Sequence, residues 1–233
     1  MLAFTDTEVS KEQLLASLEA HAAADRFQRG AYWEDGKGCA VGCTLHDFRP
    51  GKESNHNLYP ELFGIPRDLA ELEDAIFEGL PNGSAAEWPL RFTRAIKPGS
   101  DLTMVWHRFA AWLLTDPVDG VIRFAENDRQ RDAIRNVARL HERVFGGEAP
   151  KEKEWDAAWA AAWAAGRGLA LAAASAAARD AALASAAAWA AASAAARDAA
   201  LASAAAWAAA GAAARDAAYK RQADKLIELI EAT

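Results

Sequence analysis

The sequence places two cysteines and a histidine close together, at Cys39, Cys43 and His46. On a helix the two cysteines would share a face because they are four residues apart, and His46 would follow about one turn later. Thiolate and imidazole are common zinc ligands, but the spacing matches none of the usual zinc patterns, and an iron–sulfur run would need a cysteine in place of His46. We therefore expect no metal and no cofactor, and a buried helix in which both cysteines pack as small apolar residues. If zinc did bind, the fourth ligand would come from His56, Asp35 or Asp47.

The same thiols raise the alternative of a cysteine-dependent enzyme. A thiolate at Cys39 or Cys43 would need a histidine base to activate it. Residues so close in sequence rarely form such a pair without a strand–turn–helix that exposes the nucleophile, so we expect no catalytic residues. The bases nearest in sequence are His46 and His56, and the carboxylates that would orient them are Glu34 and Asp35.

Three glycines, Gly36, Gly38 and Gly42, precede or begin the same expected helix. Backbone N–H groups in a glycine-rich loop and at a helix N-terminus can bind a phosphate, and Lys37 would add a positive charge. The stretch lacks a preceding strand and the Walker lysine–serine pair. A nucleotide-binding protein that sequesters its ligand is therefore an alternative function.

Residues 31–48 are the densest group of reactive side chains in the chain. Their glycines permit close backbone approach to a ligand, and adjacent aromatic residues offer stacking area. Other charged residues look like solvated helix faces, and His21, His107 and His141 look like ordinary packing or surface residues. We predict a ligand-binding site here, formed by Tyr32, Trp33, Glu34, Asp35, Lys37, Cys39, Cys43 and His46.

The elements that would position this stretch are helical. Apolar residues recur at helical spacing along most of the chain, and no segment alternates for long enough to predict a sheet. Asp101 could cap one of these helices. We predict an all-α fold, with helices over 7–28, 59–63, 66–79, 84–96, 102–114, 128–145 and 151–165.

The C-terminal part contains an eighteen-residue tandem repeat. Residues 172–189 and 190–207 are identical, and 208–225 begin in the same way. Eighteen residues make about five helical turns, and alanine is the best helix former, so we predict one long helix that packs in a bundle or homo-oligomer. The predicted domains are a globular part over 1–150, a connector over 151–170 containing three tryptophans, and the long helix over 171–233.

Charge is distributed unevenly along the 233 residues. Residues 151–233 carry nine basic and nine acidic side chains, so the net charge of −7 comes from residues 1–150. An acidic globular part is a poor candidate for nucleic-acid binding, which depends on Lys and Arg. The sequence shows neither an apolar run of membrane-spanning length nor a signal peptide, so we expect a cytoplasmic protein that binds no membrane.

Four segments carry a resemblance: YWEDGKGCAVGCTLH, LEDAIFEGLPNG, WLLTDP and RQADKLIELIEA. Together they resemble uncharacterised bacteriophage and prophage proteins that end in variable alanine-rich helical repeats. The resemblance implies a virus-encoded accessory protein that acts inside the host cell, and it supplies no activity or catalytic residues. The expected function is a non-enzymatic interaction protein that binds a host protein or small ligand, with action against host defence as one candidate role.

Overall fold

A computed structural model describes residues 2–125, 127–166 and 212–233. This part of the chain is all-α, as predicted, and its only β-type pairings are isolated bridges at Phe27–Gly38 and Glu34–Lys37. The alanine-rich repeats and most of the predicted long helix lie outside the described residues. Contacts divide the chain into two compact units, and each is described by itself.

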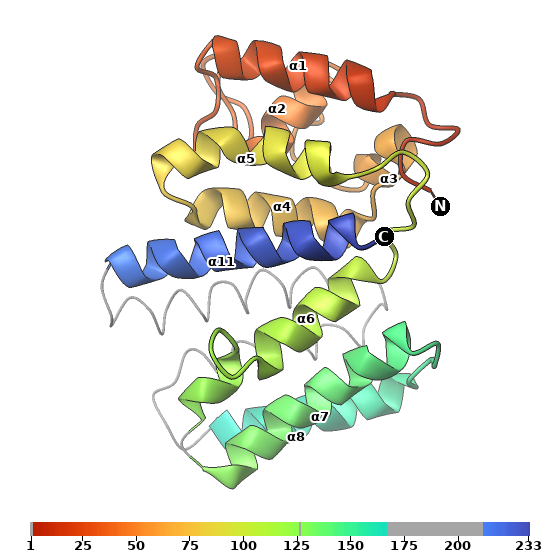
Figure 1. Cartoon of the computed structure of the whole chain (residues 1–233), viewed down its shortest axis with the longest axis vertical. Helices are drawn as coiled ribbons and strands as arrows, with labels where there is room; N and C mark the ends of the chain where they lie inside the picture. The colour runs from red at the N-terminus through yellow and green to blue at the C-terminus, as the bar shows by residue number, and fades with distance from the viewer. Residues whose placement is uncertain (1, 126, 167–211) are drawn as a thin grey trace. The chain divides into compact units, whose positions relative to one another are not determined.

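The first unit comprises Met1–Thr103 and Ala223–Thr233. Its first helix begins at Lys11 because Ser10 forms a capping box with Gln13. Figure 1 shows these helices layered around α4. The helices are α1 (Lys11–Ala23), α2 (Ala40–His46), α3 (Leu58–Phe63), α4 (Arg67–Gly79), α5 (Asn82–Ala95) and the last residues of α11 (Ala212–Glu231).

Helix α4 is the central helix of this unit. It contacts α2, α3 and α5, and its residues 69–74 are all buried. A helix covered on several sides has little solvent-exposed face for charged residues, although α4 carries five acidic side chains. Three of them, Glu71, Glu73 and Asp74, are buried as a result.

The end of the chain completes the first unit. Leu226 and Ile230 are fully buried, and two contacts fix the last turns of α11. Arg91 of α5 pairs with Asp224 at 2.7 Å, and Lys97 donates to the carbonyl oxygen of Glu231 at 2.7 Å. The closing segment of the chain therefore packs on N-terminal residues of the same chain.

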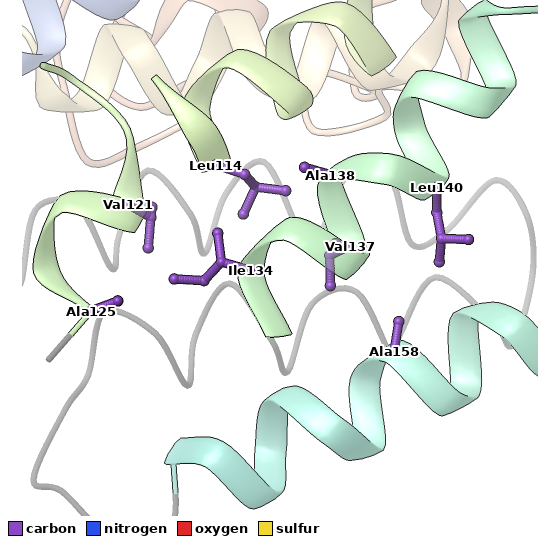
Figure 2. Packing of buried hydrophobic residues seen from close by; sticks show 8 residues of the cluster. All are labelled: Leu114, Val121, Ala125, Ile134, Val137, Ala138, Leu140 and Ala158. Carbon is purple, nitrogen blue, oxygen red and sulfur yellow. The ribbon is translucent and has the colours of Figure 1, made fainter. Parts of the chain in front are cut away.

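The second unit comprises Met104–Gln222 and contains α6 (Val105–Thr115), η1 (Val121–Phe124), α7 (Asp128–Phe145) and α8 (Glu152–Gly166). Its apolar side chains come from all four elements, with Trp155 and Ile122 packed at the edge. The buried cluster, shown in Figure 2, is Leu114, Val121, Ala125, Ile134, Val137, Ala138, Leu140 and Ala158.

Two histidines join α6 to α7 in the second unit. The Nδ1 atoms of His107 and His141 lie 2.9 Å apart, and Trp155 packs edge-on against His141 at 5.0 Å. Burial lowers the pKa of His107 to about 4 and that of His141 to about 3, so both rings are neutral at pH 7. They are packing residues, as the sequence indicates.

The contacts divide the chain at a different position from the predicted boundary at residue 150. The first division falls between Thr103 and Met104, and residues 223–233 of the predicted tail belong to the first unit. Sequence patterns locate helices but not the contacts between distant segments. No helix among the described residues combines the length and apolar character needed to cross a bilayer.

Candidate functional site

The glycines of residues 31–48 hold a loop against α2. A Cβ atom on Gly42 would lie 1.5 Å from the Tyr32 carbonyl oxygen, and one on Gly38 would lie 2.1 Å from it. The Cys39 N–H also donates to the Ala31 carbonyl at 2.9 Å. Glycine is therefore needed here for close backbone packing, and the space that a phosphate would need beside Gly42 is filled by Tyr32.

Asp35 and Gly36 form the tip of a tight turn. Their φ angles are 50° and 80°, and Glu34 and Lys37 exchange backbone hydrogen bonds of 2.8 and 2.9 Å across the turn. Positive φ at both central residues is typical of a type I′ turn, for which Asp-Gly is a preferred sequence. The exposed Asp35 side chain is thus explained by turn geometry.

Trp33, the residue before this turn, packs against His46. Their rings stack at 3.6 Å with an interplanar angle of 14°, and His21 packs edge-on against Trp33 at 5.6 Å. His46 Nδ1 lies 2.9 Å from Glu53 Oε1. Trp33 therefore uses its ring face for packing within the protein.

Tyr32 and Cys39 line a pocket with two carboxylates of α4. The pocket has a volume of about 220 Å³, and Gly30, Ala31, Asp74 and Glu78 complete its lining. Cys39 Sγ, a carboxylate oxygen of Asp74 and one of Glu78 lie within 4.8 Å of one another. Among the described residues, this is the one group of three or more Cys, His, Asp or Glu side chains gathered so closely. We call Cys39, Asp74 and Glu78 the thiol–carboxylate cluster.

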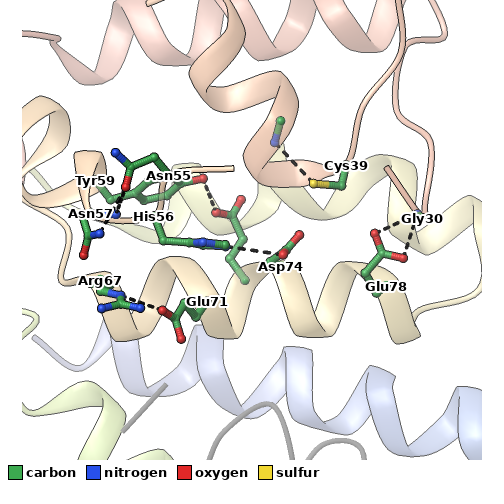
Figure 3. A network of polar contacts seen from close by, with 12 residues as sticks. Gly30, Cys39, Asn55, His56, Asn57, Tyr59, Arg67, Glu71, Asp74 and Glu78 are labelled. Carbon is green, nitrogen blue, oxygen red and sulfur yellow. Dashed lines mark hydrogen bonds and ion pairs between the residues drawn. The ribbon is translucent and has the colours of Figure 1, made fainter. Parts of the chain in front are cut away.

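Each side chain of the thiol–carboxylate cluster is also held from a second direction. The Gly42 N–H donates to Cys39 Sγ at 3.4 Å, and the Gly30 N–H donates to both oxygens of Glu78 at 3.1 Å. His56 Nε2 lies 3.4 Å from Asp74 Oδ2. In Figure 3 the Asp74 carboxylate lies between His56 and Cys39.

Asp74 has one oxygen without a hydrogen-bond partner. The residue is 8% exposed, and Oδ1 is buried and accepts no hydrogen bond from any described group. A buried acceptor left unsatisfied costs about 1–3 kcal/mol, and more when it carries charge. Asp74 also lines the pocket, so a donor or a cation that enters it would meet this carboxylate.

Glu73, the residue before Asp74, is a second buried acidic residue, and its hydrogen-bond partners are Tyr59 and Trp88. Tyr59 donates its hydroxyl to Glu73 Oε2 at 2.8 Å, and Trp88 Nε1 donates to the Glu73 carbonyl at 3.0 Å. Burial raises the pKa of Glu73 to about 8, although the Tyr59 hydrogen bond opposes the shift. Glu73 and Asp74 are therefore two adjacent buried carboxyl groups with different partners.

The geometry does not support a cysteine nucleophile. Burial, reinforced by the Asp74 carboxylate, raises the pKa of the Cys39 thiol, and burial raises that of Cys43 to about 12. The two bases suggested by the sequence lie beside carboxylates, His46 2.9 Å from Glu53 and His56 3.4 Å from Asp74, an arrangement that would orient a base without bringing it to a thiol. Among the described residues, neither thiol is hydrogen-bonded to a histidine; Cys43 Sγ approaches two backbone carbonyls instead.

The eight predicted site residues therefore do not form one site. Tyr32 and Cys39 line the pocket, Trp33 stacks on His46, and Cys43 is buried in α2. The turn holds Glu34 and Asp35 together with Lys37, which pairs with Asp25 at 3.1 Å.

Sequence reasoning missed the α4 carboxylates Asp74 and Glu78 as partners of Cys39. It did name His56, as a possible base or zinc ligand, and His56 lies beside Asp74. No local signal marked the two carboxylates. At helical spacing Asp74 and Glu78 fall away from the apolar stripe of LAELEDAIF, and Glu73 is the acidic residue that falls on it.

Comparisons with known proteins add no assignment. No protein-family model, curated protein or solved structure matches the chain.

Proposed function

We propose that the protein is a non-enzymatic binding protein, and that its first unit holds a small, positively charged ligand in the pocket beside α4. The observation that carries this proposal is the carboxylate of Asp74. Its buried Oδ1 has no hydrogen-bond partner among the described residues, and Asp74 lines a pocket together with Cys39 and Glu78. A positively charged ligand would offset the cost of burying this oxygen.

Binding is favoured over catalysis because the pocket lacks an activated group. The raised pKa keeps the Cys39 thiol protonated, and its hydrogen-bond partner is the Gly42 N–H, with no described histidine hydrogen-bonded to it. A nucleotide is disfavoured as the ligand because Asp74 and Glu78 would repel phosphate, and because the Tyr32 backbone fills the space beside Gly38 and Gly42.

The wider role that we propose is that of a bacteriophage-encoded accessory protein in the host cytoplasm. The sequence resemblance supports this role, and the neutral alanine-rich tail supports assembly into a homo-oligomer. Light scattering on the full chain tests the assembly: we expect a mass of at least two chains, and a monomer over the micromolar range would contradict it.

Native mass spectrometry of the full chain tests the binding proposal. We expect one ligand mass per chain, either on protein isolated from cells or after incubation with divalent metal ions or polyamines. Asp74→Asn and Glu78→Gln should lose that mass, whereas Glu87→Gln, which changes an exposed carboxylate on α5, should keep it. A bare chain under all of these conditions would contradict the proposal.

A further inference from the structure

We infer that Cys39, Asp74 and Glu78 form a binding site for a thiophilic divalent cation of the zinc class. This inference rests on the proposed binding function and names its ligand. The site uses residues from two elements, since Cys39 is the N-cap of α2 and the two carboxylates belong to α4. Contacts between α2 and α4 bring them together.

The spacing of the ligand atoms suits a single ion. Sulfur and oxygen bound to one tetrahedral zinc ion are about 3.6 Å apart, given bonds of about 2.3 and 2.1 Å. The three ligand atoms already lie within 4.8 Å of one another, so each needs to move by roughly 1 Å at most. Glu78 is exposed, and its side chain can make this adjustment by rotation.

The partners behind the ligands match those of metal sites. Ligating groups are commonly oriented by a hydrogen bond on the side away from the metal. Here the Gly42 N–H donates to Cys39 Sγ, and His56 lies 3.4 Å from Asp74 Oδ2, whereas the Gly30 N–H, which donates to both oxygens of Glu78, would have to release one of them to the ion. Asp74 Oδ1, the buried oxygen without a partner, is thus left for the ion.

The chemistry of the donors selects the kind of ion. A thiolate prefers zinc, cobalt and similar ions over magnesium or calcium, which bind oxygen ligands. Three protein ligands leave a fourth tetrahedral position open for solvent or a further ligand. Binding releases the Cys39 thiol proton to solvent and leaves a thiolate–metal bond.

Cobalt(II) titration of the full chain tests the inference, because a cobalt–thiolate bond gives a charge-transfer band in the near ultraviolet. We expect one cobalt ion per chain, with the band present, and displacement by zinc but not by magnesium. Cys39→Ser should abolish the band. The matched control is Cys43→Ser, which changes the other buried thiol of the same segment and should keep it.

The carboxylates are tested in the same titration. Asp74→Asn and Glu78→Gln should each weaken cobalt binding by at least tenfold, since each removes a negatively charged ligand, and Glu87→Gln should leave it unchanged. Because Glu78 is exposed, its variant should fold even if a variant at a buried position does not.

Two outcomes would overturn the inference: cobalt binding without a thiolate band, or a band that survives in Cys39→Ser. Absence of cobalt binding, combined with an Asp74-dependent organic mass in native mass spectrometry, would refute the metal and leave the binding function standing. Absence of both would refute the two proposals together.

Discussion

At the scale of single residues, the site depends on glycines that admit a neighbouring backbone. Gly42 has the Tyr32 carbonyl oxygen 1.5 Å from the position of a Cβ atom, whereas Gly83 of α5 has open space there. We expect Gly42→Ala to lower the free energy of unfolding by about 2 kcal/mol or more, because the loop must move away from α2. Gly83→Ala should be neutral or stabilising by up to about 1 kcal/mol. Urea denaturation checks both, and equal effects would contradict the packing described.

Glu73 should make stability depend on pH. Its pKa is about 8 in the folded protein and near 4.5 in the unfolded chain, so the folded state binds more protons between these values. The stabilisation from protonated Glu73 is fully present below pH 4.5 and is lost as pH rises through 8. Glu73→Gln keeps an acceptor for Tyr59 and removes this dependence.

Comparing the wild-type protein with Glu73→Gln isolates the effect of Glu73, since the other titrating groups are present in both. From pH 5 to pH 9 we expect Glu73→Gln to gain roughly 4 kcal/mol relative to wild type, measured by urea denaturation at each pH. Parallel pH profiles would show that Glu73 is ionised in the folded protein at neutral pH.

The reactive residue types were visible in the sequence, but their partners were not. Cys39 stood out because the chain has only two cysteines. Asp35–Gly36 is a typical turn sequence, but we interpreted Asp35 as a ligand-binding residue. The carboxylates of Asp74 and Glu78 resembled a solvated helix face, because periodicity assumes that a helix has one exposed side. Helix α4 is covered by several helices, which no local pattern indicates.

At the scale of elements, local signals served best where a helix is amphipathic and well capped. The predicted helix over 128–145 agrees with α7, whose cap is Asn127. The helix expected at 102–114 instead begins at Val105, because Asp101 accepts a hydrogen bond from the Thr103 N–H and forms a turn. Competing local hydrogen bonds of this kind shift helix ends by a few residues.

The end of α11 packs in the first compact unit, whereas the sequence placed it in a separate C-terminal helix over 171–233. Leu226 is fully buried in the first unit, more than 120 residues from most of the residues it joins. We expect Leu226→Ala to destabilise the protein by about 2–5 kcal/mol, as for other large-to-small core changes. The exposed Glu228 is the matched control, and Glu228→Ala should cost less than about 0.5 kcal/mol in urea denaturation. A neutral Leu226→Ala would show that this segment does not belong to the first unit.

At the scale of the whole molecule, the candidate site and the apolar cluster around Ile134 belong to different compact units. The site belongs to the first unit, whereas Ile134 is buried in the apolar cluster of the second. We expect Ile134→Ala to lower the free energy of unfolding by about 2–4 kcal/mol and to leave cobalt affinity unchanged at a temperature where the protein remains folded. A tenfold loss of affinity in this variant would show that the units are coupled.

X-ray absorption at the zinc edge, on the zinc-loaded full chain, tests the central claim most directly because it identifies the atoms bound to the ion. We expect one sulfur at about 2.3 Å and oxygen atoms at about 2.0–2.2 Å, from Cys39, Asp74, Glu78 and solvent. The sulfur should disappear in Cys39→Ser and remain in Cys43→Ser. A first shell made only of oxygen and nitrogen in the wild-type protein, or one containing two sulfurs, would contradict the account.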